Sequence, residues 1–430
     1  MAIPSERRGR RLRPSWAYGA AIVTSLTVPV AAGASSPLFV LLQKEWHFPD
    51  WQLTAAFAVY AFTLLLALLF GGSVSDHIGR RPVLIGSLIA MLVSSVVFVL
   101  AENVEAVIVA RAIQGLATGM ANSTFAALII ELAAPHRKRA ATVITSMAPV
   151  AGLALGAALA GIVIQFVPSP AQAIFMTLGV IFLIGSVVVR LTPETISARS
   201  GVLRSLIPHL AIPPSARLTF LAIAPLLFAA WMANGLFLGL APSIDHALFG
   251  VTSGTVNGLV AALEPACAAV AGVAFGRTNA RIAAFVGGST LLVGMALLAA
   301  GVTFDLFPLF ITAAVFVGIG FGTSFSAAIR SLAPRAQPHE RGGLFAAIYL
   351  VSYLAYGAPT LVAGLFTASH GFEATTLGYA LVTVALTVFG VAAQLRRSAP
   401  PAPSGDGPQD QAECHGTGQH DVADDGCHHA

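Results

Sequence analysis

Long apolar runs alternate with short polar segments along most of the chain. Each run holds about 20 or more mainly apolar residues, the length of helix that crosses a bilayer, and nearly every gap between runs contains charge, proline or glycine. We count twelve runs, at 16–42, 51–74, 82–101, 104–130, 140–166, 171–190, 217–241, 253–276, 281–301, 306–329, 343–368 and 374–394. The pattern predicts an all-α integral membrane protein with twelve transmembrane helices.

A polar stretch from Thr192 to Ala216, which contains four prolines, separates the first six runs from the last six. We therefore predict two six-helix bundles. The predicted segments are a cytoplasmic N-terminal tail (1–15), a first bundle (16–191), a cytoplasmic linker (192–216), a second bundle (217–394) and a disordered cytoplasmic tail (395–430). The loop GVAFGRTNAR from Gly272 aligns with GSVSDHIGRR from Gly72 in the matching place of the other half. This similarity indicates a decayed internal duplication.

The composition supports the membrane assignment. Hydrophobic residues make up 56% of the 430 residues and charged residues only 10%, against roughly a quarter charged in a soluble domain. Three cysteines are too few for a disulfide scaffold, and the short, separated basic clusters argue against nucleic-acid binding. The sequence has no GxxxxGK[ST] loop for ATP and no evident catalytic set. We therefore expect a protein that is not an enzyme and does not use ATP.

The positions of the basic residues predict the orientation. With a cytoplasmic N-terminus, 21 of the 23 lysines and arginines fall in cytoplasmic segments, as the positive-inside rule requires, so both termini are predicted to be cytoplasmic. The apolar run from Trp16 also resembles a secretory signal, but it is longer than the ~7–15 residues of such a signal, and we expect it to remain as the first span. Two lysines against 21 arginines, with abundant alanine, indicate a G+C-rich gene and a bacterial inner (plasma) membrane.

The segment GSVSDHIGRRPVL, from Gly72 to Leu84, resembles the loop between the second and third helices of the major facilitator superfamily. The residues that match the family pattern are Gly72, Asp76, Gly79, Arg80 and Arg81, whereas Val74, Ser75 and His77 depart from it. A carboxylate here can face the positive end of a neighbouring helix. The resemblance implies a latch between the two halves in the outward-open state; the alternative is an ordinary positive-inside loop.

Two further segments resemble motifs of the same family. RAIQGLATG resembles the fourth-helix motif, which implies a role for Arg111 in proton coupling, with Gln114 one turn along the same face. An arginine within a span is costly, although it could instead snorkel to the outer surface. MAPVAGLALGAALAG resembles the fifth-helix motif of antiporters through Gly152, Gly156 and Gly161. Close helix packing alone would also explain these glycines.

Glu264 is the one acid near the middle of a predicted span, and Pro265 follows it. Burial there disfavours the charged form of the carboxyl group, which makes Glu264 a candidate proton carrier. The alternative is a permanently protonated, hydrogen-bonded glutamic acid. The resemblance places the eighth helix against the fifth, which predicts that Glu264 lies opposite Gly152 and Gly156.

Aromatic and amide side chains at helical spacing are candidates for a substrate cavity. The candidates are Gln114 on the fourth span, Trp231 and Asn234 on the seventh, and Tyr349, Tyr353 and Tyr356 on the eleventh. Such side chains suit amphipathic or aromatic solutes, although aromatic stripes also serve packing. In the tail, Cys414, His415, Cys427 and His428 are weak candidates for a metal site, because their spacing matches no structural zinc pattern; we expect no resident metal or other cofactor.

These features together predict a secondary transporter that resembles the twelve-helix drug/proton antiporter branch of the superfamily. We expect proton-coupled efflux of a small amphipathic solute by alternating access, with the proton gradient as energy source. Its expected partners are the solute and the lipid bilayer, and we expect a monomer. The alternatives are a proton-coupled importer or uniporter of a small metabolite, and a transporter-like membrane sensor with a metal-responsive Cys/His tail.

Overall fold

The computed structural model describes residues 12–197, 210–337 and 339–396, and the regular structure within these ranges is helical. The first half contains α1 (Pro14–Trp46), α2 (Asp50–Gly71), α3 (Val74–Ile78), α4 (Arg80–Val99), α5 (Val104–Leu132), η1 (Pro135–Arg137), α6 (Lys138–Phe166) and α7 (Pro170–Leu191). Helix starts follow local chemistry: proline occupies the first turn of α1 and α7, and the Asn103 side chain accepts a hydrogen bond from the Ala106 N–H at the start of α5.

The second half contains α9 (Pro214–Gly239), α10 (Ala241–Phe249), α11 (Gly254–Ala274), η2 (Phe275–Arg277), α12 (Ala280–Thr303), α13 (Phe307–Leu332), η3 (Ala333–Arg335) and α14 (Arg341–Arg396). In the described ranges, eleven helices are long and apolar enough to cross a membrane. The last of them has 56 residues and is interrupted at Gly371, whose φ of 77° is left-handed. Two helical segments meet at this break, which falls in the gap predicted between 368 and 374.

The structure corrects two predicted boundaries. The seventh span was expected to run to residue 241, but α9 ends at Gly239 and Leu240 has non-helical backbone angles. A separate nine-residue helix, α10, then starts with Pro242 in its first turn, where the missing N–H of proline costs no hydrogen bond. The first span is longer than expected, because α1 continues to Trp46 and ends at His47 in a left-handed conformation.

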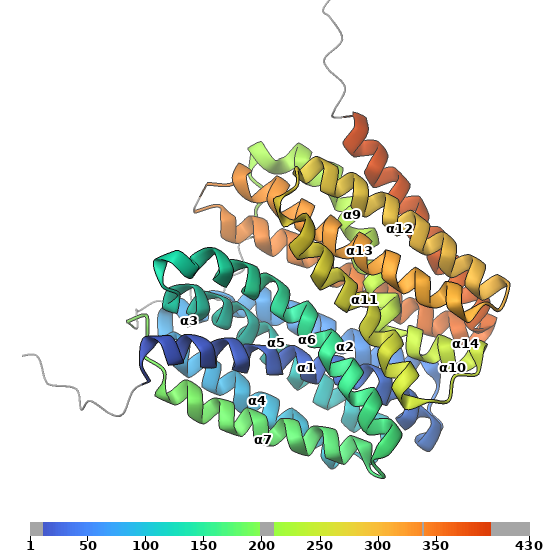
Figure 1. Cartoon of the computed structure of the whole chain (residues 1–430), viewed down its shortest axis with the longest axis horizontal. Helices are drawn as coiled ribbons and strands as arrows, with labels where there is room; N and C mark the ends of the chain where they lie inside the picture. Colours follow the sequence, from blue (N-terminus) through green and yellow to red (C-terminus); the bar gives the residue numbers. More distant parts are fainter. Residues whose placement is uncertain (1–11, 198–209, 338, 397–430) are drawn as a thin grey trace, which may run out of the picture.

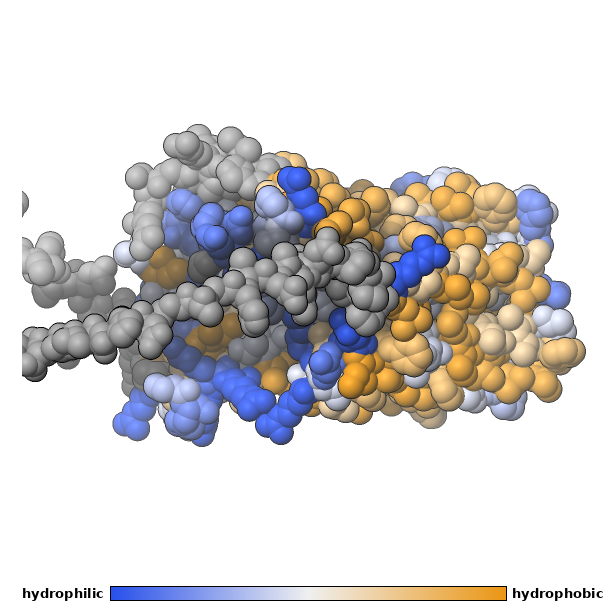
Figure 2. Space-filling model, turned by 90° about the horizontal axis from the view of Figure 1, so that it is seen from above, coloured by the Kyte–Doolittle hydropathy of each residue, from blue (hydrophilic) through white to orange (hydrophobic). Residues whose placement is uncertain are grey.

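The outer surface of the helices is apolar. Phe166, Leu218, Val270 and Leu381 each expose 70% or more of their surface. Figure 2 shows hydrophobic residues covering most of the flank, with hydrophilic residues gathered towards one end. A broad exposed apolar surface is unusual for a soluble protein, and here it matches the side of a bundle that faces lipid.

The two halves meet along two helix pairs, α2 with α14 and α6 with α11 (Figure 1). We call the end of the molecule that carries α3 the α3 end, and the opposite end, with α10 and the start of α11, the α10 end. Near the α10 end a Cβ built on Gly258 would lie 2.5 Å from the Cα of Gly161, and one built on Gly364 would lie 1.9 Å from the Thr54 hydroxyl. Glycine therefore lets the halves touch closely at this end.

Candidate functional site

The loop between α2 and α4 is organised around Arg80, which is 6% exposed. Its guanidinium lies 2.6 Å from the Asp76 carboxylate and 2.9 Å from that of Glu131 at the end of α5, and it also donates to the Ser75 hydroxyl at 2.6 Å. Gly79, with φ of 101° and ψ of 155°, makes the sharp turn into α4 in a conformation that other residues rarely adopt. The predicted motif is thus a compact charge cluster.

Glu194, just after α7, completes this cluster and was missed from the sequence. Its two carboxylate oxygens accept the backbone N–H groups of Arg80 and Arg81 at 2.8 and 3.0 Å. A carboxylate at this place satisfies unpaired donors of the first turn of α4 and complements the helix dipole. The signal in the sequence is an isolated acid at the start of the linker.

The described contacts of the loop motif lie within the first half. Asp76 pairs with Arg80, the Arg81 guanidinium donates to the Arg190 carbonyl, and a ring nitrogen of His77 lies 3.1 Å from the Ser73 carbonyl. The side chain of Asp76 keeps 53% of its surface exposed. A latch to the second half in another conformation therefore stays a prediction.

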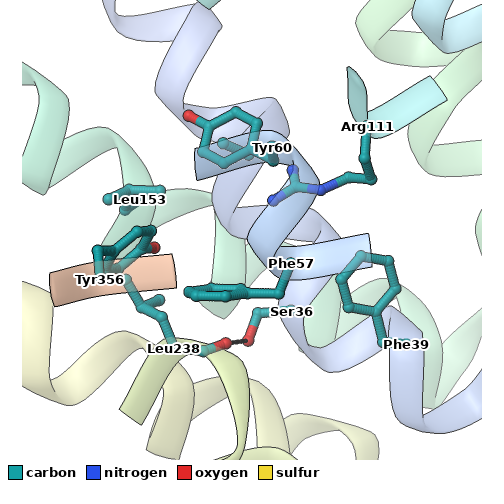
Figure 3. A pocket seen from close by; sticks show the side chains of 9 residues that line it. Ser36, Phe39, Phe57, Tyr60, Arg111, Leu153, Leu238 and Tyr356 are labelled. Carbon is teal, nitrogen blue, oxygen red and sulfur yellow. Dashed lines mark hydrogen bonds between the residues drawn. The ribbon is translucent and has the colours of Figure 1, made fainter. Parts of the chain in front are cut away.

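Arg111 is buried in α5, with 2% of its surface exposed. Its guanidinium donates to the Gln114 side chain and, at 3.4 Å, to the Ala56 carbonyl. The guanidinium carbon also lies 3.9 Å from the centre of the Tyr60 ring, where a cation–π interaction stabilises the charge. The snorkelling alternative does not describe this conformation, because the side chain points into the bundle (Figure 3).

A small cavity of about 10 Å³ lies beside Arg111 and has walls from both halves, enough space for about one water. Its lining residues are Ala32, Ser36, Phe39, Phe57, Tyr60, Arg111, Leu153, Leu238 and Tyr356. Across it, the Ser36 hydroxyl of α1 donates to the Leu238 carbonyl of α9 at 2.5 Å (Figure 3). The buried arginine therefore faces the boundary between the halves.

Glu264, on α11, has no exposed surface. One carboxyl oxygen accepts a hydrogen bond of 2.8 Å from the Asn234 amide of α9, and the other oxygen, Oε1, has no partner. A buried carboxyl oxygen without a partner is costly, so it suits a group that gains and loses a proton. The sequence named both residues but could not show that they bond to each other.

Aromatic rings gather at the boundary between the halves, beside Arg111. Trp231 packs against Tyr353 and Tyr356 with ring centroids 5.1 and 5.7 Å apart, and Tyr356 in turn lies 4.6 Å from Phe57 of the first half. The phenol of Tyr356 is within electrostatic range of both Arg111 and Glu264. Tyr349 extends the row, 6.4 Å from Tyr353. The aromatic residues predicted for the cavity therefore form one cluster, and the indole N–H of Trp231 in it has no hydrogen-bond partner. Gln114 and Asn234 bond Arg111 and Glu264 instead.

The expectation that Glu264 lies opposite Gly152 and Gly156 is wrong. A Cβ on Gly152 would meet Pro29, and one on Gly156 would meet the carbonyl of Val30, so both glycines face α1 within the first half. Of the three motif glycines, Gly161 faces α11. Helical periodicity predicts a shared face, but it does not tell which neighbour covers that face.

The tail residues proposed for a metal site, Cys414, His415, Cys427 and His428, lie outside the described residues. Within the described ranges, no group of three or more His, Cys, Asp or Glu side chains could hold a metal ion.

A chain of apolar helices in two halves, with buried polar groups at their boundary, has the architecture of a membrane transporter. A family model for the Major Facilitator Superfamily matches residues 21–356. The chain belongs to the Major Facilitator Superfamily; it is a multi-pass membrane transporter and not an enzyme.

Solved structures share the fold. The inward-open xylose transporter XylE from E. coli superposes with a TM-score of 0.70 at 13% identity, over 88% of this chain and 96% of that one. A partially occluded inward-open form of XylE gives a TM-score of 0.68 at 14% identity, over 87% and 96% of the two chains. At this identity the likeness concerns the fold.

Curated relatives match over short segments. The multidrug transporter mfsB of Aspergillus fumigatus is 36% identical over 107 residues, 24% of this chain and 17% of that protein. The multidrug resistance protein MdtL of Escherichia coli is 40% identical over 68 residues, 16% of this chain and 17% of that protein. Human solute carrier family 22 member 23 is 34% identical over 105 residues, 24% of this chain and 15% of that protein. The matches thus span less than a fifth of each relative.

Proposed function

We propose that the protein is a proton-coupled secondary transporter that exports a small amphipathic solute by alternating access. The observation that carries the proposal is the arrangement at the boundary between the halves. Buried Glu264 of the second half and buried Arg111 of the first half both lie within electrostatic range of Tyr356, a member of one aromatic cluster. Aromatic faces with few polar groups suit an amphipathic solute, and a carboxyl group with a free oxygen suits proton exchange.

The coupling follows from the hydrogen bond between Asn234 and Glu264. When Glu264 is charged, the Asn234 amide stabilises the anion by donating to it. When a proton binds, the carboxyl group becomes neutral, and the electrostatic effect of its negative charge on a bound solute is lost. Proton binding therefore changes the affinity of this cluster for the solute through the charge of Glu264. Coupling requires such a link between the two binding events.

The relatives support a transporter of small molecules and leave its direction open. Two of the matched relatives carry multidrug names, which favours export, whereas one structural neighbour is titled a proton:xylose symporter. A proton-coupled importer is therefore the second candidate, because the same site would serve it. We further propose a monomer in the inner membrane of a bacterium, without a resident cofactor.

Transport by proteoliposomes with an imposed pH gradient tests the proposal. Dyes, antibiotics, sugars and amino acids are added in turn while lumenal pH is recorded. We expect one compound class to trigger proton movement in the wild type, and we expect Glu264→Gln to abolish that movement because an amide cannot release a proton. The direction of proton movement relative to the compound separates export from import.

Asp305→Asn is the matched control, since Asp305 is an exposed acid between α12 and α13 and its substitution should leave transport unchanged. A Glu264→Gln protein that transports at the wild-type rate with the same pH dependence would contradict the proposal. If no compound moves protons in any variant, deletion of residues 410–430 and an assay of signalling would test the sensor alternative.

Neutralising Asp76 should slow transport while leaving solute binding intact. In Asp76→Asn the ion pair with Arg80 is lost, and so is the carboxylate that would face the second half in the proposed latch. We expect turnover to fall about tenfold, corresponding to roughly 1.4 kcal/mol on the switching barrier, with an unchanged Kd. Unaltered turnover in Asp76→Asn would exclude the latch.

A further inference from the structure

A second buried carboxyl group lies near the α10 end, in the short helix that follows the break at Leu240. Asp245 has no exposed surface. Its Oδ1 accepts a hydrogen bond of 2.9 Å from the Asn257 amide of α11, and the same amide nitrogen donates to the Pro242 carbonyl, also at 2.9 Å. The other oxygen, Oδ2, has no partner, and neither does the side-chain oxygen of Asn257.

Charged groups near Asp245 do not neutralise it. In the described part of the chain, Asp245 takes part in no ion pair, and the side chain that bonds its carboxyl group is that of Asn257. The His246 ring lies 2.9 Å from the Val251 carbonyl, away from this pair. α10 packs against α1, α9, α11 and α14. The titratable side chains on these helices towards this end are Lys44, Glu45, Glu264, His370, Glu373 and Tyr379. Lys44, Glu45, His370 and Glu373 are exposed, and the Tyr379 hydroxyl donates to the Met232 carbonyl.

The pair is built into the contact between the halves. Asn257 lies between Gly254 and Gly258 in the sequence. A Cβ on Gly258 would lie 2.5 Å from the Gly161 Cα of α6, and one on Gly254 would lie 2.7 Å from the Ile164 side chain of α6. α10 also packs on α1, and the Ser36 hydroxyl of α1 bonds the Leu238 carbonyl close to the break. If the halves separated at this end, the junction of α9 and α10 would therefore lose its cover from α1, and the adjoining contact of α11 with α6 would open.

We propose that Asp245, held by Asn257, is a proton-binding site that senses whether the two halves are closed at the α10 end. When the halves are closed, the carboxyl group is dry and the neutral, protonated form is favoured. When they separate, water reaches the junction of α9 and α10 and the proton can leave. Because the closed state binds the proton more tightly, low pH favours closure at this end and high pH favours separation.

This site is distinct from the one at Glu264. Asn257 and Glu264 are seven residues apart on α11, about 10 Å along the helix axis, and the residues between them on that face, Val260 and Ala261, are apolar and buried. The proposal rests on alternating access as proposed above, but it does not require that Glu264 exchanges protons.

The test uses the full chain in lipid nanodiscs, with spin labels on Phe166→Cys of α6 and Phe304→Cys after α12. Both positions are exposed, at 76% and 69%, and they belong to opposite halves. The three native cysteines are replaced by alanine, and the distance distribution is measured without solute from pH 5 to pH 9. We expect the ratio of separated to closed molecules to rise with pH, by up to about tenfold per unit for one proton.

Asp245→Asn should remove most of this pH dependence and keep the halves closed at high pH, while Asp305→Asn should retain the wild-type pH dependence. A second variant guards against misfolding: in Asn257→Ala the closed state loses the donor to the charged carboxylate, so the ratio at pH 9 should rise about tenfold and the ratio at pH 5 should stay unchanged. An unaltered pH dependence in Asp245→Asn, or equal ratios for Asn257→Ala and wild type at both pH values, would overturn the proposal. Loss of transport in Glu264→Gln alone would leave it standing.

Discussion

Gly258→Val is expected to hold the two halves apart at the α10 end and to reduce transport severely. A Cβ at this position would lie 2.5 Å from the Gly161 Cα and 2.7 Å from the Ala157 carbonyl oxygen, both of them backbone atoms that cannot rotate away. Overpacking of this kind costs about 1–3 kcal/mol, and here the cost falls only on the state in which α6 and α11 touch. That state should therefore be depleted by about 5- to 150-fold.

The measurement pairs the spin-label distance between positions 166 and 304 with transport in proteoliposomes. Gly378→Val is the matched control, because Gly378 is an exposed helical glycine of α14 with nothing within 4 Å of its added Cβ. A Gly258→Val protein with the wild-type distance distribution and turnover would show that the close approach of the glycines does not govern closure.

Arg80→Ala is expected to give the largest loss of stability among the substitutions considered. The side chain joins α3 to α5 through Asp76 and Glu131, whose side chains keep 53% and 30% of their surface exposed. Water can therefore partly replace the lost partner, and the loss of these charge-assisted hydrogen bonds should cost about 1.5–3 kcal/mol. We expect a corresponding fall in thermal unfolding temperature in detergent, measured at constant protein and detergent concentration.

Arg139→Ala tests whether this loss is specific. Arg139 is exposed at the start of α6, close to the same end of the molecule, and removal of such a surface charge should change stability by less than about 1 kcal/mol. Equal unfolding temperatures for Arg80→Ala and wild type would mean that the ion pairs of Arg80 contribute nothing to the folded state.

The sequence predicted the helical membrane architecture because a bilayer imposes a minimum length on each apolar run, and length is readable without a structure. It also predicted the family and the residues of the loop motif. It did not predict Glu194, because a carboxylate becomes a helix cap only when the linker folds back onto α4. The break at Leu240 was missed although Gly239 and Pro242 flank it, since hydrophobicity continues through it and hides the change of direction.

The internal site illustrates the same limit. Glu264, Asn234 and Trp231 were all candidates from residue type and position, yet the bond between Glu264 and Asn234 depends on how α9 and α11 are rotated about their axes. Gly152 and Gly156 were assigned to the wrong partner for that reason: their spacing defines a smooth face, and the same smooth face fits α1 as well as α11.

The position of Trp231 makes it an intrinsic fluorescence probe of the aromatic cluster. Of the four tryptophans in the chain, Trp16, Trp46 and Trp51 lie on α1 and α2, so Trp231 is the single indole of the second half. With the other three replaced by phenylalanine, its fluorescence would come from within the aromatic cluster, 5.1 Å from Tyr353 and 5.7 Å from Tyr356. A solute that enters between these rings should change the emission wavelength and the energy transfer from tyrosine, which allows solutes to be screened by light before any flux is measured.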